Sequence, residues 1–319
     1  MNATKVTVYE HAADLPRLSG EDFFHSPQLM LLCEQTSRHK PLMAVVTAAD
    51  GCVLGHLLCI VRYRVSWLPP FVYSHARIYG DNGCTAEVFD RLMTVLTDRL
   101  QNRVLYIEVS HLNEKMFGYR TLRHLSFFHV RWMNVHNSLH SRTPEQRITP
   151  RMQRRVEHGI GRGAYTKLVE TPDEFRAFSR LLRRHNWLKP RRYLPPDDFF
   201  QGMMKHDHCR IYITKVHQQT VGCAVCVYSK GDAYLWYSAS RRKSFAPFHP
   251  NAVTFWNVIK DSHARGYQHI RFMDVGLPFR SNPYRDFILR FGGKEVSTYR
   301  WFRISIRWVN RLATWLWRE

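Results

Sequence analysis

Arginines with helical spacing are the first feature of the sequence that points to chemistry. Five of them lie between Arg147 and Arg162, at intervals of four, three to four, and seven residues. These intervals place them on one face if the segment is helical. A guanidinium group pairs with a phosphate through two parallel hydrogen bonds, so the face predicts phosphate binding. A solvated helix face is the competing interpretation. The candidate residues are Arg151, Arg154, Arg155 and Arg162.

A second basic group lies in the loop that precedes an expected helix. The loop covers residues 240–251 and contains Arg241, Arg242 and Lys243. It has no glycine, and its two prolines lack the N–H that a backbone phosphate cradle needs. We therefore expect the three basic side chains to hold a phosphate here, and we assign Asn251, at the helix start, to substrate binding.

A carboxylate and a tyrosine stand near the ends of two neighbouring expected strands. Asp274 ends one strand, where a carboxylate can accept a proton from an attacking amine or orient that amine. It is our catalytic candidate, and a cap for the following turn is the alternative. Tyr237 is assigned to substrate binding, with a packed ring and a wet hydroxyl as the alternative.

Composition limits the class of protein. The 319 residues include 47 Lys+Arg and 26 Asp+Glu, a net charge of +21, and 45% are hydrophobic. This apolar fraction excludes a disordered chain. The positive charge is typical of a protein with a polyanionic partner, and a solvated basic surface is an equal alternative. The seven cysteines lack the spacing of a disulfide framework, so we expect reduced thiols. Cys223 and Cys226 form a C-x-x-C pattern, but it falls in an expected strand. Side chains three residues apart on a strand lie on opposite faces, so we do not expect this pair to bind a metal. We find neither a secretory leader nor an apolar run of about 18 residues, and so expect a cytoplasmic protein.

Two similar series of elements follow one another along the chain. In the first, we predict strands at 5–9, 42–47, 53–63, 104–109 and 127–135, and helices at 27–35, 86–100 and 113–120. In the second, the capping box Thr171–Glu174 opens a helix, strands are predicted at 210–216, 221–228, 233–238 and 269–275, and helices at 250–264 and 284–291.

Local matches between the two series indicate an internal duplication. Residues 55–59 match residues 222–226, Glu108 matches Asp274, and Tyr119-Arg120 matches Tyr284-Arg285, at offsets of 165 to 167. We place the boundary in the polar stretch that precedes residue 150. The predicted domains are 1–147 and 148–319, with the basic connecting helix at the start of the second.

The element order resembles the acetyltransferase-like GNAT fold. Two copies of this order in one chain resemble the Fem-type aminoacyltransferases (FemABX). Three segments carry this resemblance. They are the basic segment 148–163, the strands 221–238 with Pro250-Asn251 after them, and Asp274-Val-Gly276 followed by residues 284–293. The expected fold class is α/β (α+β), with two tandem GNAT-like domains. Each domain would have a mixed central sheet flanked by helices.

The resemblance implies an acyltransferase. It would transfer an aminoacyl group from charged tRNA to an amine of a nucleotide- or lipid-linked cell-wall precursor in peptidoglycan synthesis, and it would require no metal or other cofactor. The resemblance also places Arg285 and Arg290 near a substrate phosphate or carboxylate, with salt bridges to Asp286 or Asp274 as the competing account. Two alternatives remain: a GNAT N-acyltransferase that uses acetyl-CoA or another acyl-CoA on a sugar or lipid-linked substrate, and a non-catalytic basic binding protein.

The C-terminal segment is basic and rich in tryptophan. Trp308, Val309, Leu312, Trp315 and Leu316 have helical spacing, with arginines close by. An amphipathic helix of this kind can lie on an anionic membrane. Packing against the first domain is the competing interpretation and the one that we favour from the sequence.

Overall fold

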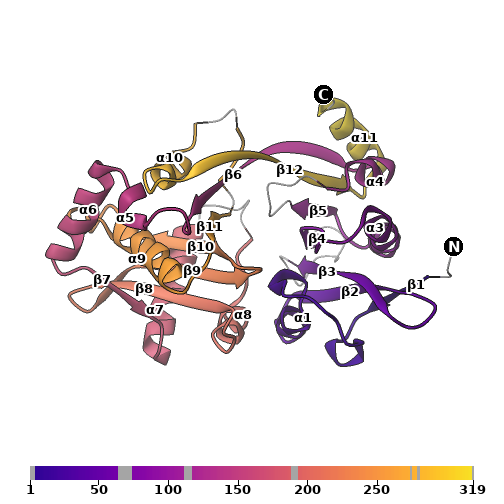
Figure 1. Cartoon of the computed structure of the whole chain (residues 1–319), viewed down its shortest axis with the longest axis horizontal. Helices are drawn as coiled ribbons and strands as arrows, with labels where there is room; N and C mark the ends of the chain where they lie inside the picture. Colours follow the sequence, from indigo (N-terminus) through magenta and orange to yellow (C-terminus); the bar gives the residue numbers. More distant parts are fainter. Residues whose placement is uncertain are drawn as a thin grey trace. The chain divides into compact units, whose positions relative to one another are not determined.

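The computed structural model describes residues 4–63, 74–110, 117–187, 193–273, 275–278 and 281–317. The chain divides into two compact units (Figure 1). Unit 1 consists of residues 1–132 and 297–319, and unit 2 consists of residues 133–296. Each unit is a mixed β-sheet flanked by helices, as the sequence predicted.

The sheet of unit 1 has six strands in the order β1 (Lys5–Tyr9), β2 (His39–Thr47), β3 (Val53–Tyr63), β4 (Ser74–Tyr79), β5 (Tyr106–Ser110) and β12 (Lys294–Ile304). Neighbouring strands are antiparallel except for β4 and β5, which are parallel. The helices are α1 (Pro27–Glu34), α3 (Ala86–Leu100), α4 (Tyr119–His124) and α11 (Arg307–Leu316).

Local sequence signals explain the elements of unit 1. The hairpin between β2 and β3 turns at Gly51, which has a φ of 85°. Helix α3 begins after Thr85, whose side chain accepts a hydrogen bond from the N–H of Val88. The apolar residues of α3 recur with helical spacing, and they bury Phe89, Leu92 and others against the sheet.

The sheet of unit 2 repeats this pattern in the order β7 (Tyr165–Leu168), β8 (Cys209–Val216), β9 (Gln219–Ser229), β10 (Asp232–Ser240), β11 (His269–Phe272) and β6 (Phe128–Ser138). Only β10 and β11 are parallel. The helices are α5 (Pro144–Arg147), α6 (Pro150–Gly161), α7 (Pro172–Asn186), α8 (Asp197–Met203), α9 (Pro250–Ala264) and α10 (Pro283–Leu289). The repeated order of elements supports the predicted duplication.

The first turn of α7 shows how the sequence fixes one helix of unit 2. The Thr171 side chain accepts from the N–H of Glu174, as a capping box requires. The Glu174 carboxylate accepts from the N–H of Glu170 and pairs with Lys215. Burial acts to raise the pKa of Glu174, but Lys215, the Glu170 N–H and Lys167 outweigh it and lower the pKa to about 2. The helix start is therefore tied to strand β8 by an ionised carboxylate.

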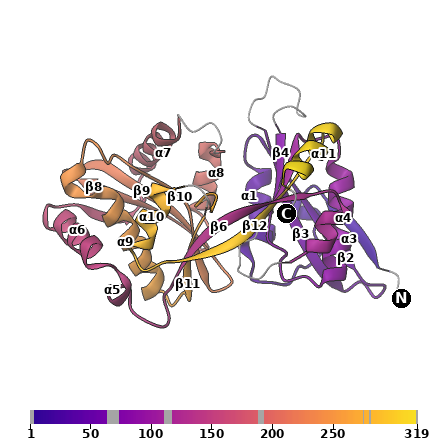
Figure 2. The ribbon, with the colours of Figure 1, turned by 90° about the horizontal axis from the view of Figure 1, so that it is seen from above.

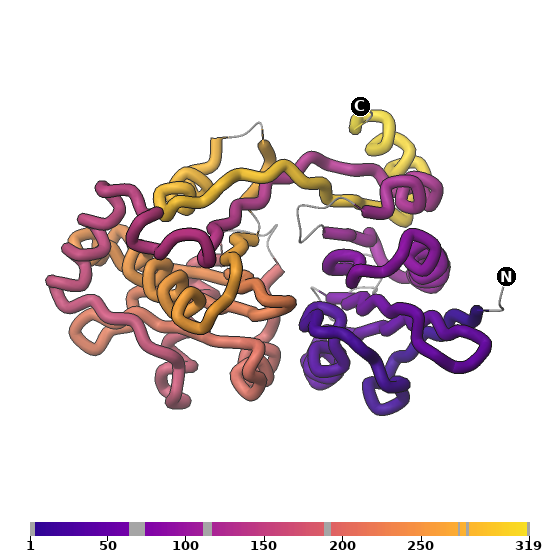
Figure 3. The backbone as a smooth tube through the Cα atoms, in the orientation of Figure 1, coloured from indigo at the N-terminus to yellow at the C-terminus, as the bar shows by residue number. Residues whose placement is uncertain are grey.

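The last strand of each half of the sequence crosses into the other unit. Strand β6 follows the elements of unit 1, yet it pairs with β11. Strand β12 follows the elements of unit 2, yet it pairs with β5. In Figure 3 the yellow backbone that includes β12 can be followed from unit 2 into unit 1.

This exchange differs from the predicted boundary at residues 147 and 148. The units divide inside β6 and inside β12, and residues 297–319 belong to unit 1. The prediction relied on the polar stretch before residue 150 as a linker. That stretch holds α5, which contacts α9 within unit 2.

Most predicted elements are present, and the differences have simple reasons. Strands β4 and β7 and helix α8 were not predicted. The predicted helix 113–120 falls partly on residues 111–116, outside the described residues; the observed α4 begins at Tyr119. Burial raises the pKa of the Cys223 and Cys226 thiols to about 12, so both are protonated packing groups. Within the described residues, no helix is long and apolar enough to cross a membrane.

Candidate functional site

The parallel strands of unit 2 separate where those of unit 1 stay paired. Pairing between β10 and β11 ends at Leu235 and Phe272, and the register of β10 shifts between Leu235 and Tyr237. Strand β10 then continues to Ser240, paired only with β9 among the described strands. In unit 1, β4 and β5 remain paired to their last residues, Tyr79 and Ser110. The sheet of unit 2 therefore opens at a point where the sheet of unit 1 stays closed.

A cavity of about 370 Å³ lies at the end of β10 and is lined by residues of α9 and α10. Figure 2 shows where these three elements lie in unit 2. Its lining is part apolar, from Phe255 and Phe287, and part polar, from hydroxyl and amide groups. Such a combination suits an organic substrate that must be oriented. The polar lining residues are His185, Ser238, Ser240, Arg242, Asn251, Thr254, Asn282 and Tyr284.

A second cavity of about 350 Å³ adjoins the first. The two share the lining residues Arg242, Asn251, Pro283 and Phe287. The second is also lined by Arg155 from α6 and Arg290 from the end of α10. We call the two cavities together the α9 site. Three guanidinium groups from three separate elements line it, which is a suitable arrangement for binding phosphate.

Two glycines allow the surrounding elements to approach this site closely. A Cβ at Gly222 on β9 would collide with the Thr254 hydroxyl of α9. A Cβ at Gly159 on α6 would lie 2.5 Å from the carbonyl oxygen of Phe248. Because both glycines lack a Cβ, β9 packs against the first turns of α9, and α6 brings Arg155 up to the cavity.

The start of α9 offers few backbone donors. His249, the residue before the helix, has a φ of 43° and a ψ of 50°. The next residue, Pro250, has no N–H. The N–H groups of Ala252 and Val253 both donate to the carbonyl of His249. An ordinary helix start leaves several N–H groups for a ligand, whereas this one relies on side chains.

The electrostatic field at the helix start is positive. Burial lowers the pKa of His249, and Arg155, His158 and Arg162 lower it further through their positive charges. The imidazole is therefore biased toward its neutral form. An anion among these groups would relieve the repulsion.

Four of the predicted site residues line the α9 site: Arg155, Arg242, Asn251 and Arg290. The other predicted phosphate-binding residues are close in sequence to residues that line the site, but they do not line it themselves. Arg151, Arg154, Arg162 and Lys243 are exposed, and the Arg241 guanidinium lies 5.0 Å from the ring centroid of Phe245. The predicted helical face of α6 is present, and one of its arginines reaches the cavity.

The remaining predicted residues are placed differently from the expectation. Tyr237 is 3% exposed, and its ring packs edge-on against Phe200 at 5.4 Å. Arg285 donates from Nη1 to the carbonyl of Leu277 and pairs with Glu295 at 3.0 Å. Neither lines the α9 site, because packing and ion pairing already engage them. Asp274 lies outside the described residues.

Several lining residues were not predicted. Asn282 accepts from the N–H of Tyr284 and donates to the carbonyl of Val275. Its position before Pro283 is a helix-start signal that could have identified it. The Thr254 hydroxyl lies within hydrogen-bond distance of the Thr214 hydroxyl and donates to the carbonyl of Pro250, contacts that no sequence pattern indicates.

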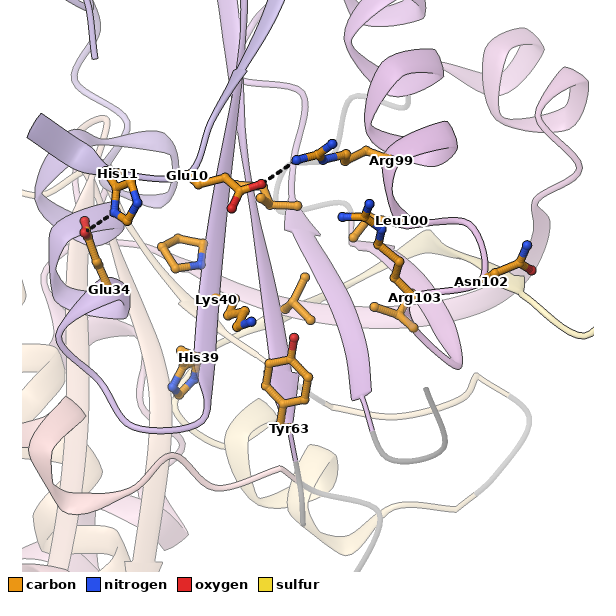
Figure 4. Close-up of a pocket in the computed structure, with 14 residues that line it drawn as sticks. Glu10, His11, Glu34, His39, Lys40, Tyr63, Arg99, Leu100, Asn102 and Arg103 are labelled. Carbon is orange, nitrogen blue, oxygen red and sulfur yellow. Dashed lines mark hydrogen bonds and ion pairs between the residues drawn. The ribbon is translucent and has the colours of Figure 1, made fainter. Parts of the chain in front are cut away.

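Unit 1 has a separate cavity of about 620 Å³, between strands β2 and β3 and the end of α3 (Figure 4). Glu10 pairs with Arg99 at 2.6 Å, and Glu34 with His11 at 2.8 Å. No predicted site residue lines this cavity. Because both carboxylates are already paired, we do not place the reaction here.

The carboxylate that matches Asp274 in the other half of the sequence is also paired. Glu108 on β5 accepts from Arg300 at 3.1 Å and from the Ser110 hydroxyl at 3.1 Å, and Arg77 lies 3.4 Å away. All four residues are buried. In unit 1 this position joins β4, β5 and β12 through a buried charge network.

Comparison with known proteins agrees with this fold. Residues 147–283, which include most of the residues that line the α9 site, match a family model described as an acetyltransferase (GNAT) domain. The structure of FemX aligns with a TM-score of 0.59 and 12% identity over 85% of this chain and 90% of that one. A tandem GNAT protein from the clavulanic acid biosynthesis pathway aligns with a TM-score of 0.58 and 11% identity, over 95% and 99% of the two chains.

A third similar structure is the C-terminal domain of a putative lysylphosphatidylglycerol synthetase from Agrobacterium fabrum. It aligns with a TM-score of 0.58 and 10% identity, over 92% of this chain and 91% of that one. No curated protein matches the sequence significantly. At these identities the likeness shows the fold: the chain has a tandem GNAT fold, shared with FemX, as its sequence predicted.

Proposed function

We propose that this protein is an acyltransferase of the Fem type, with the phosphate groups of its acyl donor bound in the α9 site. One observation carries the proposal. Arg155, Arg242 and Arg290 converge on adjoining cavities where the parallel strands of unit 2 separate. Most residues that line these cavities, Arg155 and Arg242 among them, lie in the segment 147–283 that matches the GNAT domain model, and Arg290 follows it.

The donor we favour is an aminoacyl-tRNA. A pyrophosphate held mainly by backbone N–H groups needs a helix start with several free donors, and the start of α9 has few. Arginine side chains suit the phosphates at the end of a nucleic acid equally well. The exposed Arg151, Arg154 and Arg162, with Arg241 and Lys243 in the loop after β10, would contact phosphates farther along the tRNA.

The reaction is an aminolysis. The amine nitrogen of a nucleotide- or lipid-linked cell-wall precursor attacks the ester carbonyl of the aminoacyl-tRNA, and a C–N bond forms. The C–O bond to the ribose then breaks, and the proton lost by the amine is transferred to the departing ribose oxygen. Asp274 is our candidate to relay this proton, and alignment of two bound substrates would supply much of the rate.

Acyl-CoA is the second candidate donor, with a sugar or lipid-linked amine as the acceptor. It is favoured by the match of residues 147–283 to an acetyltransferase domain model. Its phosphates would bind to the same three arginines. The two candidate functions are therefore separated by which donor the protein binds.

The test compares binding of bulk charged tRNA with binding of acetyl-CoA at two salt concentrations. We expect tRNA affinity that falls steeply with salt, and a loss of about tenfold or more in Arg290→Glu, because a charged hydrogen-bonded contact is removed. Arg176→Glu is the matched control, since it makes the same charge change at an exposed position of α7.

The outcomes separate the candidates. Binding of acetyl-CoA that Arg290→Glu abolishes, with little tRNA binding, would replace the first donor by the second. Equal losses in Arg290→Glu and Arg176→Glu would show that net charge rather than the α9 site attracts the donor. Binding of neither donor would refute the proposal.

A further inference from the structure

Helix α11 presents large apolar side chains to solvent. Trp308 is 70% exposed, Leu312 48%, Trp315 62% and Leu316 63%. Their spacing of four, three and one residues places all four on one face of the helix. Exposed apolar groups that gather on one face, rather than being scattered, mark a contact surface.

The helix is held firmly with this face outward. The Asn310 side chain accepts from the N–H of Ile304 and donates to the carbonyl of Ser126. Just before the helix, the Ser305 N–H donates to the carbonyl of Leu105. These bonds attach α11 to unit 1 by a different face, so the helix packs on this unit and still leaves its tryptophans exposed.

A basic cavity of about 680 Å³ flanks the same helix. Four arginines line it: Arg123 from α4, Arg303 from β12, and Arg307 and Arg311 from α11. The rest of the described lining consists of residues with hydroxyl or amide groups and the apolar residues Phe127 and Ile304, and it contains no carboxylate. Figure 1 shows α11 and α4 at the same end of unit 1.

The position of the arginines relative to the apolar face is informative. At about 100° per residue, Arg307 and Arg311 lie roughly a third of a turn from the centre of the Trp/Leu face. Burial lowers the pKa of Arg303, with the charge of Arg307 acting in the same direction and Asp98 opposing it. The cavity therefore concentrates positive charge beside the apolar face.

We propose that α11 and this cavity form a docking surface for a bilayer of anionic phospholipid. The Trp308, Leu312, Trp315 and Leu316 side chains enter the interface, where tryptophan is favoured. The arginines bind the phosphate of a lipid headgroup at the level where the acyl chains begin. The inference does not depend on the acyl donor.

Charge complementarity selects this occupant over two others. A second copy of the chain would bring two arginine clusters together. A nucleic acid would pair with the arginines but would leave the leucines in water. An anionic bilayer satisfies both the arginines and the apolar face.

The test is flotation of the full chain with vesicles of phosphatidylcholine alone and with about one third phosphatidylglycerol. We expect binding to the anionic vesicles that weakens with salt, and about tenfold or greater loss in the double variant Trp308→Ser, Trp315→Ser, because two interfacial side chains are removed. Arg307→Glu with Arg311→Glu should abolish the preference for anionic lipid. Trp187→Ser is the control, since Trp187 is 83% exposed and lies in unit 2.

Three results would overturn the inference. They are unchanged binding in the tryptophan double variant, equal binding to both vesicle types, and a wild-type dimer that this variant converts to monomer. A second measurement guards against misfolded variants: brominated lipid should quench wild-type tryptophan fluorescence more than that of Trp308→Phe, Trp315→Phe. Equal quenching of the two proteins would also contradict the inference.

Discussion

Neighbouring residues with the same side chain have different surroundings in this protein. Arg154 and Arg155 are adjacent on α6, yet Arg154 is exposed and Arg155 is half-buried at the α9 site. The sequence identifies both as basic residues of one helix face. Only the packing of α6 against the segment that precedes α9, made close by Gly159, separates a surface charge from a candidate ligand.

This pair allows a matched comparison. We predict that Arg155→Glu lowers the affinity for inorganic pyrophosphate by about tenfold or more, while Arg154→Glu lowers it by less than about threefold, because only the first arginine can contact the anion directly. Isothermal titration at moderate salt measures both. Similar losses in the two variants would mean that pyrophosphate senses only the general field of α6.

His249 makes the same site sensitive to pH. Its pKa is lowered from 6.5 by burial and by the charges of Arg155, His158 and Arg162. A bound anion offsets these charges and raises the pKa, so binding takes up a proton. Anion affinity should therefore rise as the pH falls toward the lowered pKa of His249, and His249→Gln should remove this rise. Titration in buffers of different ionisation enthalpy counts the proton directly; no uptake in the wild type would contradict the assignment.

At the scale of elements, the two halves use the same device to bring a helix onto the sheet. A Cβ at Gly222 on β9 would meet Thr254, and a Cβ at Gly55 on β3 would lie 2.7 Å from Val88. These are the glycines that matched in the sequence at an offset of 167. Both glycines let a helix pack closely on a strand. This shared structural role supports the predicted duplication beyond the match in sequence.

We predict that Gly222→Ala destabilises the protein by about 1–3 kcal/mol and weakens anion binding, because α9 must move away from β9. The control is Gly161→Ala, at the end of α6, where an added Cβ meets nothing within 4 Å. Thermal melting and pyrophosphate titration give the two readouts. Equal melting temperatures for the two variants would show that β9 and α9 adjust freely.

The elements also show what the sequence could and could not reveal. Helix α3 matched its prediction because its apolar residues recur with helical spacing and Thr85 caps it. Strand β4 was not predicted because it buries His75 and Arg77, so it has no apolar alternation. Arg77 is tolerated there by Glu108 on β5, a partner far away in the sequence. The α9 site is similar. The sequence predicted Arg155, Arg242 and Arg290 as binding residues, but tertiary packing brings them together.

At the scale of the whole molecule, the exchange of β6 and β12 is the main departure from a linear arrangement of domains. Trp301, close to the C-terminal end of the sequence, is 1% exposed and packs in the core of unit 1. It also pairs with Val109 across β12 and β5. The duplicated pattern of the sequence gave no sign that the last strands were exchanged, because each half contains a full set.

We predict that Trp301→Ala destabilises unit 1 by about 3–5 kcal/mol through the cavity it leaves. Hydrogen exchange should show lost protection in β4 and β5, which belong to unit 1, and retained protection in β8 and β9 of unit 2. Phe255→Ala, in the core of unit 2, should give the opposite pattern. Lost protection in unit 2 after Trp301→Ala would contradict the division of the chain.

The exchanged strands set an order of events during protein synthesis. The ribosome makes β1 to β5 early, but the strand that covers the open edge of β5 is β12, which emerges only after every strand of unit 2. Unit 2, in contrast, has all its strands once β11 has been made. Nascent unit 1 must wait with an exposed sheet edge, which can pair with other chains. The cell therefore has reason to protect the growing polypeptide until β12 has been made and has paired with β5.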